Sequence, residues 1–355
     1  MKRIEIGDKT VGDGHPTFVI AEAGANYHIS KDPKINFKHA LKLVDIAADA
    51  GADSVKFQLY RANKLYSESA GSAGYLGSGK PIYEVIRERE LPYEWLGKLA
   101  SHCDKRGIIF LCSPFDEASA DELEGIGISA YKVASYSIDN ISFLRHVARK
   151  KRPVLLSTGA SEINEIKRAV EIIKKEGNSK IAVLQCTAKY PAPLSSVNLR
   201  VIPRLKAIFD TPIGLSDHSR DPLIAPLGAV ALGANIIEKH YTTDNSLPGP
   251  DHTFAVLPEE LRDMVRGIRG MEAALGSAEK KVTPEERELQ QFAKNFLYAK
   301  VGIRDRGVLS EGNVIALRPG TGKRGVSASE IDRVLGKKAR RDLVKGDAIG
   351  KNDYE

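Results

Sequence analysis

The chain has 355 residues, 42% of them hydrophobic, which is enough to bury a large core. Its three cysteines, Cys103, Cys112 and Cys186, are odd in number and lack a CxxC spacing, which argues against a disulfide framework or a structural zinc site and favours a reducing, cytoplasmic compartment. No uncharged apolar stretch reaches the roughly 18 residues of a membrane span, and the first residues lack the apolar core of a signal peptide, so we expect no membrane partner.

The formal net charge of +7 is concentrated near the C-terminus. Residues 297–355 hold 13 Lys and Arg against 8 Asp and Glu, whereas the rest of the chain is nearly neutral. The basic run GKKARR (336–341) contains no aromatic residue and lies in no recognised nucleic-acid motif. We therefore expect a solvated basic surface or a site for small anions, and no nucleic-acid partner.

Short apolar, β-rich runs alternate along the chain with segments of helical periodicity, such as the apolar series within 163–173. Several of the helical segments end near a glycine, at Gly51, Gly107 and Gly177. Strand followed by helix, repeated eight times over roughly 250 residues, predicts a (β/α)8 TIM barrel over 1–281 rather than an open doubly wound sheet. The predicted strands are 17–23, 53–58, 108–113, 130–134, 153–157, 181–185, 212–216 and 234–239.

The charged stretch KKVTPEERELQQFAKN predicts a linker over 282–296. Within it, Thr283 and Pro284 predict the N-cap and the first residue of a helix. The segment that follows, 297–355, contains short β-like runs, YAKVGI and NVIAL, with frequent glycines. We expect a small β-rich domain there, too small to be a second catalytic domain.

Polar side chains gather where the predicted strands end. In a barrel the carboxyl ends of all strands meet on one face, where active sites are built. Ordinary polar residues that bound strands would explain any one of these positions, but they explain the whole set poorly. The residues are Glu22 on the first strand, Lys56 and Gln58 on the second, Ser113 on the third, Lys132 and Ser135 on the fourth, Ser157 on the fifth, Ser216 on the seventh and His240 on the eighth.

Two histidines follow successive predicted strands, His218 in IGLSDHS and His240 in NIIEKHYTTD. Two imidazoles with the acidic neighbours Asp217, Glu238 and Asp251 can hold one divalent cation while positions stay open for a substrate. A pair of structural histidines is the alternative interpretation. The other polar groups on the same face favour the metal site.

Two lysines and several serines around one mouth predict a site for a small, multiply anionic ligand, because ammonium and hydroxyl groups stabilise phosphate and carboxylate oxygens. The alternative for Lys56 and Lys132 is a salt bridge to a neighbouring carboxylate, since buried lysines are rarely unpaired. The metal would polarise a carbonyl of a second substrate, with Glu22 or Asp251 available for proton transfer or hydroxyl binding.

The chain closely resembles the sialic acid synthase family over nearly its whole length. Its members condense phosphoenolpyruvate with an N-acylated mannosamine-type sugar: C3 of phosphoenolpyruvate attacks the aldehyde of the open-chain sugar, water adds at C2, and phosphate leaves. The resemblance implies a transferase whose C-terminal module is an antifreeze-like SAF domain. The motifs that carry it are AEAGANY, DSVKFQ, YKVAS, LLSTGAS, QCTAKYPAP, GLSDHS, EKHYTTD, LPGPDH and LRPGTG; YKVAS and AKYPAP look most like the branches for spore-coat polysaccharide and for pseudaminic and legionaminic acids.

The resemblance also implies roles for single residues. His218 and His240 match ligands of a divalent metal, manganese or alternatively magnesium or cobalt. Arg318, in the RPG motif, matches an arginine that reaches from the partner subunit into the barrel of its neighbour in a domain-swapped homodimer. We expect the sugar side to be formed by the catalytic candidates Glu22, Gln58, Tyr190 and Asp251, and the phosphoenolpyruvate side by Lys56, Ser113, Lys132, Ser135, Ser157 and Ser216.

Two departures from the family pattern touch the sugar side. Many members have Gly-Glu after the serine of the fourth strand and Asn after the Cys-Thr of the sixth, whereas this chain has Tyr136-Ser137 and Ala188. The acceptor sugar, phosphorylated or not, therefore stays open. Two other functions compete: a metal-dependent pyruvate or sugar aldolase, against which the lysines and serines argue, and a non-catalytic carbohydrate- or ice-binding protein, which would leave the barrel site without a purpose.

Overall fold

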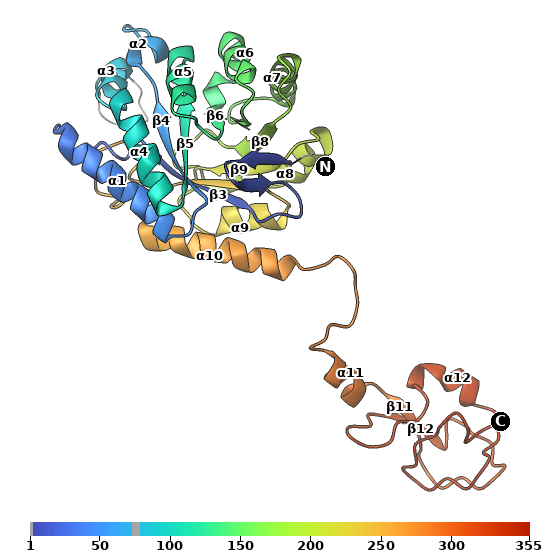
Figure 1. Cartoon of the computed structure of the whole chain (residues 1–355). Coiled ribbons are helices and arrows are strands. Elements are labelled where there is room, and N and C mark those ends of the chain that lie inside the picture. The colour runs from blue at the N-terminus through green and yellow to red at the C-terminus, as the bar shows by residue number, and fades with distance from the viewer. Residues whose placement is uncertain (1–2, 73–78) are drawn as a thin grey trace. The chain divides into compact units, whose positions relative to one another are not determined.

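The computed structural model describes residues 3–72 and 79–355, and the chain divides into two compact units, 1–276 and 277–355. The first unit contains a closed barrel of eight parallel strands in which β10 pairs with β3, which confirms the predicted (β/α)8 fold (Figure 1). Each strand overlaps one of the eight predicted runs. The strands are β3 (Phe18–Gly24), β4 (Ser54–Leu59), β5 (Ile109–Pro114), β6 (Tyr131–Val133), β7 (Val154–Ser157), β8 (Ile181–Cys186), β9 (Ile213–Asp217) and β10 (Ile236–His240).

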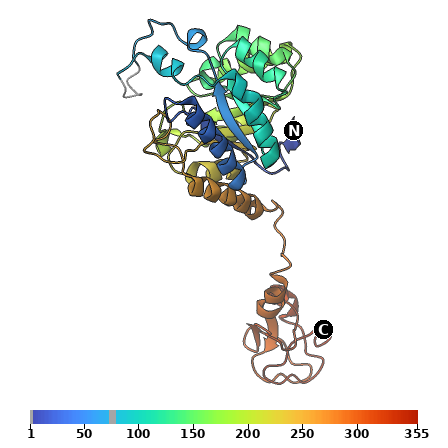
Figure 2. The ribbon, with the colours of Figure 1, turned by 60° about the vertical axis from the view of Figure 1, so that its left-hand side comes forward.

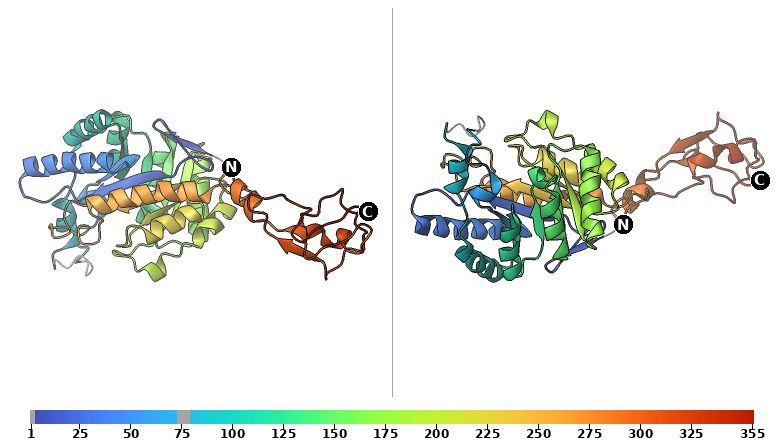
Figure 3. Two further views of the ribbon diagram at one scale, coloured as in Figure 1. Left: turned by 90° about the horizontal axis from the view of Figure 1, so that it is seen from below. Right: turned by 90° about the horizontal axis from the view of Figure 1, so that it is seen from above.

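Helices surround the strands of the barrel (Figure 2). Helix α10 packs against both α9 and α1, which completes the ring of helices (Figure 3). Side chains cap several helix starts, as where Asp32 accepts a hydrogen bond from the backbone nitrogen of Lys34. The helices are α1 (Pro33–Asp49), α2 (Ala62–Leu65), α3 (Ile82–Arg87), α4 (Tyr93–Arg106), α5 (Glu117–Gly125), α6 (Ile141–Arg149), α7 (Ile163–Lys175), α8 (Val201–Ile208), α9 (Ile224–Ala231) and α10 (Pro258–Leu275), with single 3₁₀ turns at Ser135–Ser137 and Leu194–Ser196.

Successive strand residues point alternately into the barrel and toward the helices. On β3, Phe18 and Ile20 belong to the apolar core inside the barrel, whereas Val19 and Ala21 belong to the core between strands and helices. The apolar filling inside the barrel occupies its amino-terminal part. The inward positions that follow along the strands carry polar side chains, beginning with Glu22 on β3 and Lys56 on β4. A buried polar layer therefore lies at the carboxyl-terminal end of the barrel.

A short hairpin precedes the barrel and is absent from the sequence prediction. Strands β1 (Ile4–Ile6) and β2 (Lys9–Val11) pair antiparallel, and their buried residues Ile4, Ile6 and Val11 join the apolar core inside the barrel. Strands of three residues are too short for the alternation test used on the sequence, which explains the omission.

The second unit has its own core. Strands β11 (Phe296–Ala299) and β12 (Val314–Leu317) pair antiparallel, in agreement with the predicted β-rich character of this segment. Helix α11 (Arg287–Ala293) begins three residues after the predicted start at Pro284, because 284–286 form a turn closed by the contact from the backbone nitrogen of Glu286 to the carbonyl oxygen of Thr283. A 3₁₀ turn (Ala328–Glu330) and α12 (Ile331–Val334) follow.

None of the helices in the described part of the chain is long and apolar enough to span a membrane.

Candidate active site

One pocket at the carboxyl-terminal end of the barrel collects eleven of the predicted site residues. It also includes Phe115, Ala134, Cys186 and Glu238, which were not among the predicted substrate-binding residues. The eleven are Glu22, Lys56, Gln58, Ser113, Lys132, Ser135, Ser157, Tyr190, Ser216, His218 and His240. The structure therefore brings together side chains from all eight strands and the loops that follow them.

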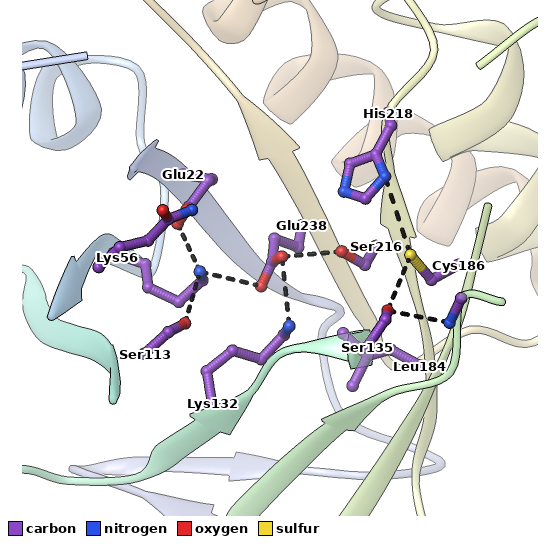
Figure 4. A network of polar contacts seen from close by, with 12 residues as sticks. Glu22, Lys56, Ser113, Lys132, Ser135, Leu184, Cys186, Ser216, His218 and Glu238 are labelled. Carbon is purple, nitrogen blue, oxygen red and sulfur yellow. Dashed lines mark hydrogen bonds and ion pairs between the residues drawn. The ribbon is translucent and has the colours of Figure 1, made fainter. Parts of the chain in front are cut away.

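Two lysines and two glutamates form a buried ion-pair group in the pocket (Figure 4). The Nζ atom of Lys56 lies 2.6 Å from Oε2 of Glu22 and 3.8 Å from Oε2 of Glu238. The Nζ atom of Lys132 lies 3.6 Å from Oε1 of Glu238. Both lysines thus form the salt bridges of the alternative interpretation, and Glu238 contacts both of them.

The two lysines and two glutamates of this group balance in charge, but the surroundings shift their pKa values in different directions. Burial raises the pKa of Glu22, although the neighbouring Lys56 opposes the shift. Burial lowers the pKa of Lys132, with only partial compensation by Glu238. For Glu238, burial acts to raise the pKa, but Lys132 and Lys56 outweigh it and the pKa falls. Glu238 therefore keeps its negative charge more strongly, and Glu22 takes up a proton more readily.

Hydroxyl groups surround the lysines. The Nζ atom of Lys56 donates to Oγ of Ser113 over 3.0 Å, and Oγ of Ser216 donates to Glu238 over 2.8 Å. The backbone nitrogen of Gly159 donates to Oγ of Ser135 over 2.9 Å. The buried Oγ of Ser157 has no hydrogen-bond partner within the described residues. An unmatched buried hydroxyl costs about 1–3 kcal/mol, so an oxygen-rich ligand in the pocket would supply what is missing.

The two predicted metal ligands both line the pocket and lie edge to face, at an interplanar angle of 65°. The ring centroids of His218 and His240 are 5.5 Å apart. The Nδ1 atom of His218 lies 2.9 Å from the carbonyl oxygen of Thr187, which can only accept, so Nδ1 carries a hydrogen. Burial acts to lower the pKa of His218, but the neighbouring Cys186 outweighs it and the pKa rises. In the neutral ring the lone pair is therefore on Nε2. The Nδ1 atom of His240 is buried and makes no hydrogen bond within the described residues. Burial holds the pKa of His240 well below its usual range.

These residues fit a divalent cation in part. A carbonyl that fixes the tautomer of one histidine and a neutral second histidine are the usual companions of metal-binding imidazoles. Within residues 3–72 and 79–355, however, no three His, Cys, Asp or Glu side chains are grouped as a complete ligand set. Water and substrate oxygens would have to complete the coordination, as in an open catalytic site.

Of the three acidic residues predicted to lie beside the histidines, Asp217 was predicted wrongly. Asp217 does not face the pocket, because strand alternation turns it toward the helices, where its Oδ2 pairs with Lys239 over 2.6 Å. Glu238 does face the pocket but lies against the lysines. Asp251 fits the prediction, because its Oδ2 atom lies 3.9 Å from Nδ1 of His240. The two-residue period of a strand could have given these orientations from the sequence.

The residues expected on the sugar side also come together. A Cβ atom built on Gly24 would lie 3.2–3.4 Å from polar atoms of Glu22, Asp251 and Gln58, so the three side chains converge on this glycine. Gln58 donates to Glu22 over 2.9 Å, and burial raises the pKa of Asp251 to about 6. Tyr190 lies beside the histidines instead, with its ring centroid 4.2 Å from that of His218 and 6.2 Å from that of His240.

The remaining predicted positions are less central. Ser137 is buried in the turn after β6, and Tyr136 beside it is 67% exposed, with its hydroxyl donating to the carbonyl oxygen of Ala188 over 3.4 Å. Arg318 is an exposed residue of the second unit, directly after β12. Its predicted role in a partner's barrel stays a prediction.

Comparisons with known proteins agree with this geometry. A model described as the NeuB family matches residues 43–280, and one described as the SAF domain matches residues 295–355. The chain is 41% identical to the spore coat polysaccharide biosynthesis protein SpsE of Bacillus subtilis, over 97% of this chain and 95% of that protein. It is 35% identical to the N,N'-diacetyllegionaminic acid synthase of Legionella pneumophila, over 97% and 96%. The crystal structure of the sialic acid synthetase of Leptospira borgpetersenii matches with a TM-score of 0.73 at 33% identity, over 82% of this chain and 96% of that one.

Proposed function

Because this chain belongs to the NeuB family, we propose that it is a nonulosonic acid synthase that condenses phosphoenolpyruvate with an N-acylated mannosamine-type sugar and releases phosphate. The observation that carries the proposal is the buried layer of lysines and serines at the carboxyl end of the barrel. That layer suits a small ligand with both phosphate and carboxylate oxygens.

On the phosphoenolpyruvate side, Lys56 and Lys132 would bind the anionic oxygens, and the unmatched hydroxyl of Ser157 would donate to one of them. The charges of Lys56, Lys132, Glu22 and Glu238 balance one another. A proton taken up by Glu22 leaves the group with one excess positive charge, which favours an incoming anion. The remaining hydroxyls, from Ser113, Ser135 and Ser216, would fix the orientation of the ligand.

On the sugar side, Glu22, Gln58, Tyr190 and Asp251 would hold the acceptor, with its aldehyde carbon close to C3 of phosphoenolpyruvate. A bond forms between these two carbons, water adds to C2, and the bond from C2 to the phosphate oxygen breaks. Glu22 or Asp251 would deliver the proton that the aldehyde oxygen needs, because burial raises the pKa of both carboxyls.

His218 and His240 would hold a divalent cation, which we propose to be manganese, with magnesium or cobalt as alternatives. When bound, the cation would polarise the aldehyde oxygen and stabilise the negative charge that develops there. The chain's own residues would present two imidazoles from the ends of neighbouring strands, with ring centroids 5.5 Å apart. His218 would bind the cation in its neutral form, with the lone pair on Nε2.

Family membership also leads us to propose an oligomeric state and a cellular location. We propose a homodimer in which Arg318 of one subunit completes the site of the other. We also propose a cytoplasmic location, which the three buried free cysteines support. A non-catalytic role for the barrel gains no support from a site in which charged groups are buried at a cost to stability.

The test measures phosphate released from phosphoenolpyruvate with manganese and a panel of amino sugars, starting with N-acetylmannosamine and including 2,4-diacetamido and 6-phosphorylated sugars. Control reactions omit the sugar or contain a chelator. We expect release that requires both the sugar and the metal. An aldolase would join pyruvate to the sugar without phosphoenolpyruvate. Product formation from pyruvate and the sugar, in the absence of phosphoenolpyruvate, would therefore refute the proposed synthase activity.

A further inference from the structure

A buried ion pair joins Lys239 and Asp217, the residues that directly precede the two histidines in the chain. Lys239 precedes His240 at the end of β10, and Asp217 precedes His218 at the end of β9. The side chains of both ion-pair residues are 1% exposed, and their charged atoms are 2.6 Å apart. The pair therefore links the two strands one residue before each proposed ligand.

The contacts of Lys239 extend beyond Asp217 to the loop after β9. Its Nζ atom also donates to the backbone and side-chain oxygens of Ser219, and to the carbonyl oxygen of Asp221 over 2.9 Å. Asp217 in turn accepts from the backbone nitrogen and the hydroxyl of Ser219, over 2.9 and 3.0 Å. The loop that contains His218 is thus fastened on both sides of that residue to the strand that ends in His240.

Strand alternation separates this ion pair from the pocket. Glu238 and His240 point into the barrel, and Lys239, which lies between them, points toward the helices. The ammonium of Lys239 therefore does not bind substrate. Burial of an ion pair is seldom a net gain in stability, so its place beside both ligands calls for another explanation.

We infer that Lys239 is a positioning residue which, with Asp217, sets the separation of the His218 and His240 rings and thereby the affinity for a divalent cation. The inference rests on the proposed function, because it takes the two histidines as metal ligands. Groups that orient metal ligands without touching the metal typically contribute 10- to 100-fold to metal affinity.

The test replaces the whole pair, Asp217→Leu with Lys239→Met, because removal of one partner alone would leave a buried charge and could unfold the barrel. The control is the single substitution Lys206→Met, which can be made alone because Lys206 and its partner Asp13 are about a quarter exposed and Asn235 also donates to Asp13. Lys206 also pairs with an aspartate, Asp13, over 2.6 Å and with a backbone carbonyl, but it lies by the start of β10 at the opposite end of the barrel. Manganese binding to the full-length protein without substrates is measured by calorimetry, and thermal unfolding is recorded for each variant.

We expect the double variant to fold and to bind manganese 10- to 100-fold more weakly than the unaltered protein, while Lys206→Met keeps its affinity within about twofold. In turnover assays the manganese concentration for half-maximal activity should rise by the same factor. Unchanged manganese affinity in a folded double variant would overturn the inference and leave the synthase proposal standing. An equal loss in Lys206→Met would also overturn it, since the effect would then be general. Absence of manganese binding by the unaltered protein would instead refute the metal site itself.

Discussion

Lys132→Met gives the sharpest test of the anion site. Methionine keeps most of the volume of the lysine and removes its charge, so packing changes little. A hydrogen bond from a charged donor contributes about 1.5–3 kcal/mol, which corresponds to about 10- to 150-fold in affinity for phosphoenolpyruvate. The substitution also removes one of the two lysines beside Glu238, the one 3.6 Å away, while Lys56 stays at 3.8 Å. The lost attraction is about 4–5 kcal/mol at an effective dielectric constant of 20.

Lys56, which Glu238 shares with Glu22, would be the remaining cationic partner of Glu238. The carboxylate of Glu238 would then repel the incoming anion more strongly or take up a proton, so we expect the loss to lie at the upper end of this range, about 100-fold. Calorimetric titration with phosphoenolpyruvate in the presence of manganese measures the effect without turnover. Adding Glu238→Gln to the Lys132→Met variant removes the negative charge of Glu238 and should recover about tenfold of the lost affinity for phosphoenolpyruvate.

Affinity within twofold of the unaltered protein in the folded Lys132→Met variant would refute the assignment of Lys132 to the phosphoenolpyruvate site. A double variant that binds no better than the single one would show that Glu238 does not oppose the ligand, even if Lys132 binds it. Thermal unfolding of both variants provides the control for an intact barrel.

Three further predictions concern the metal, the sugar side and the barrel wall. Treatment with a chelator should abolish phosphate release and added manganese should restore it, whereas His240→Ala should stay inactive at any manganese concentration that restores the unaltered protein. Asp251→Asn should lower kcat about 100-fold or more, as for loss of an acid–base group, while calorimetry finds phosphoenolpyruvate binding unchanged; an equal loss of binding would contradict its place on the sugar side. Gly214→Ala should destabilise the barrel by about 1–3 kcal/mol, because the new Cβ would lie 2.6 Å from the carbonyl oxygen of Ile236, whereas Gly125→Ala, with open space around it, should be neutral or stabilising in the same unfolding experiment.

The sequence by itself predicted the barrel fold, which the structure confirms, and the residue types of a candidate site at one end of the barrel. Eight apolar runs alternating with helical segments specify a barrel, because strand and helix periodicity are local properties of the chain. The fold then places strand ends on one face, so residue types at those ends, such as Lys56, Ser157 and His240, indicate an anion site with a metal before any coordinates are known.

The tertiary structure alone decided which of these groups contact each other. Closure of the barrel pairs β10 with β3, which puts Glu238 against lysines from β4 and β6 and brings Asp251 beside Glu22. The outward orientation of Asp217 follows from strand alternation, but only the pairing of β9 with β10 puts it 2.6 Å from Lys239. Contacts of this kind depend on distances between residues far apart in the chain, and the packing of the closed barrel sets those distances, whereas the periodicity of single segments does not.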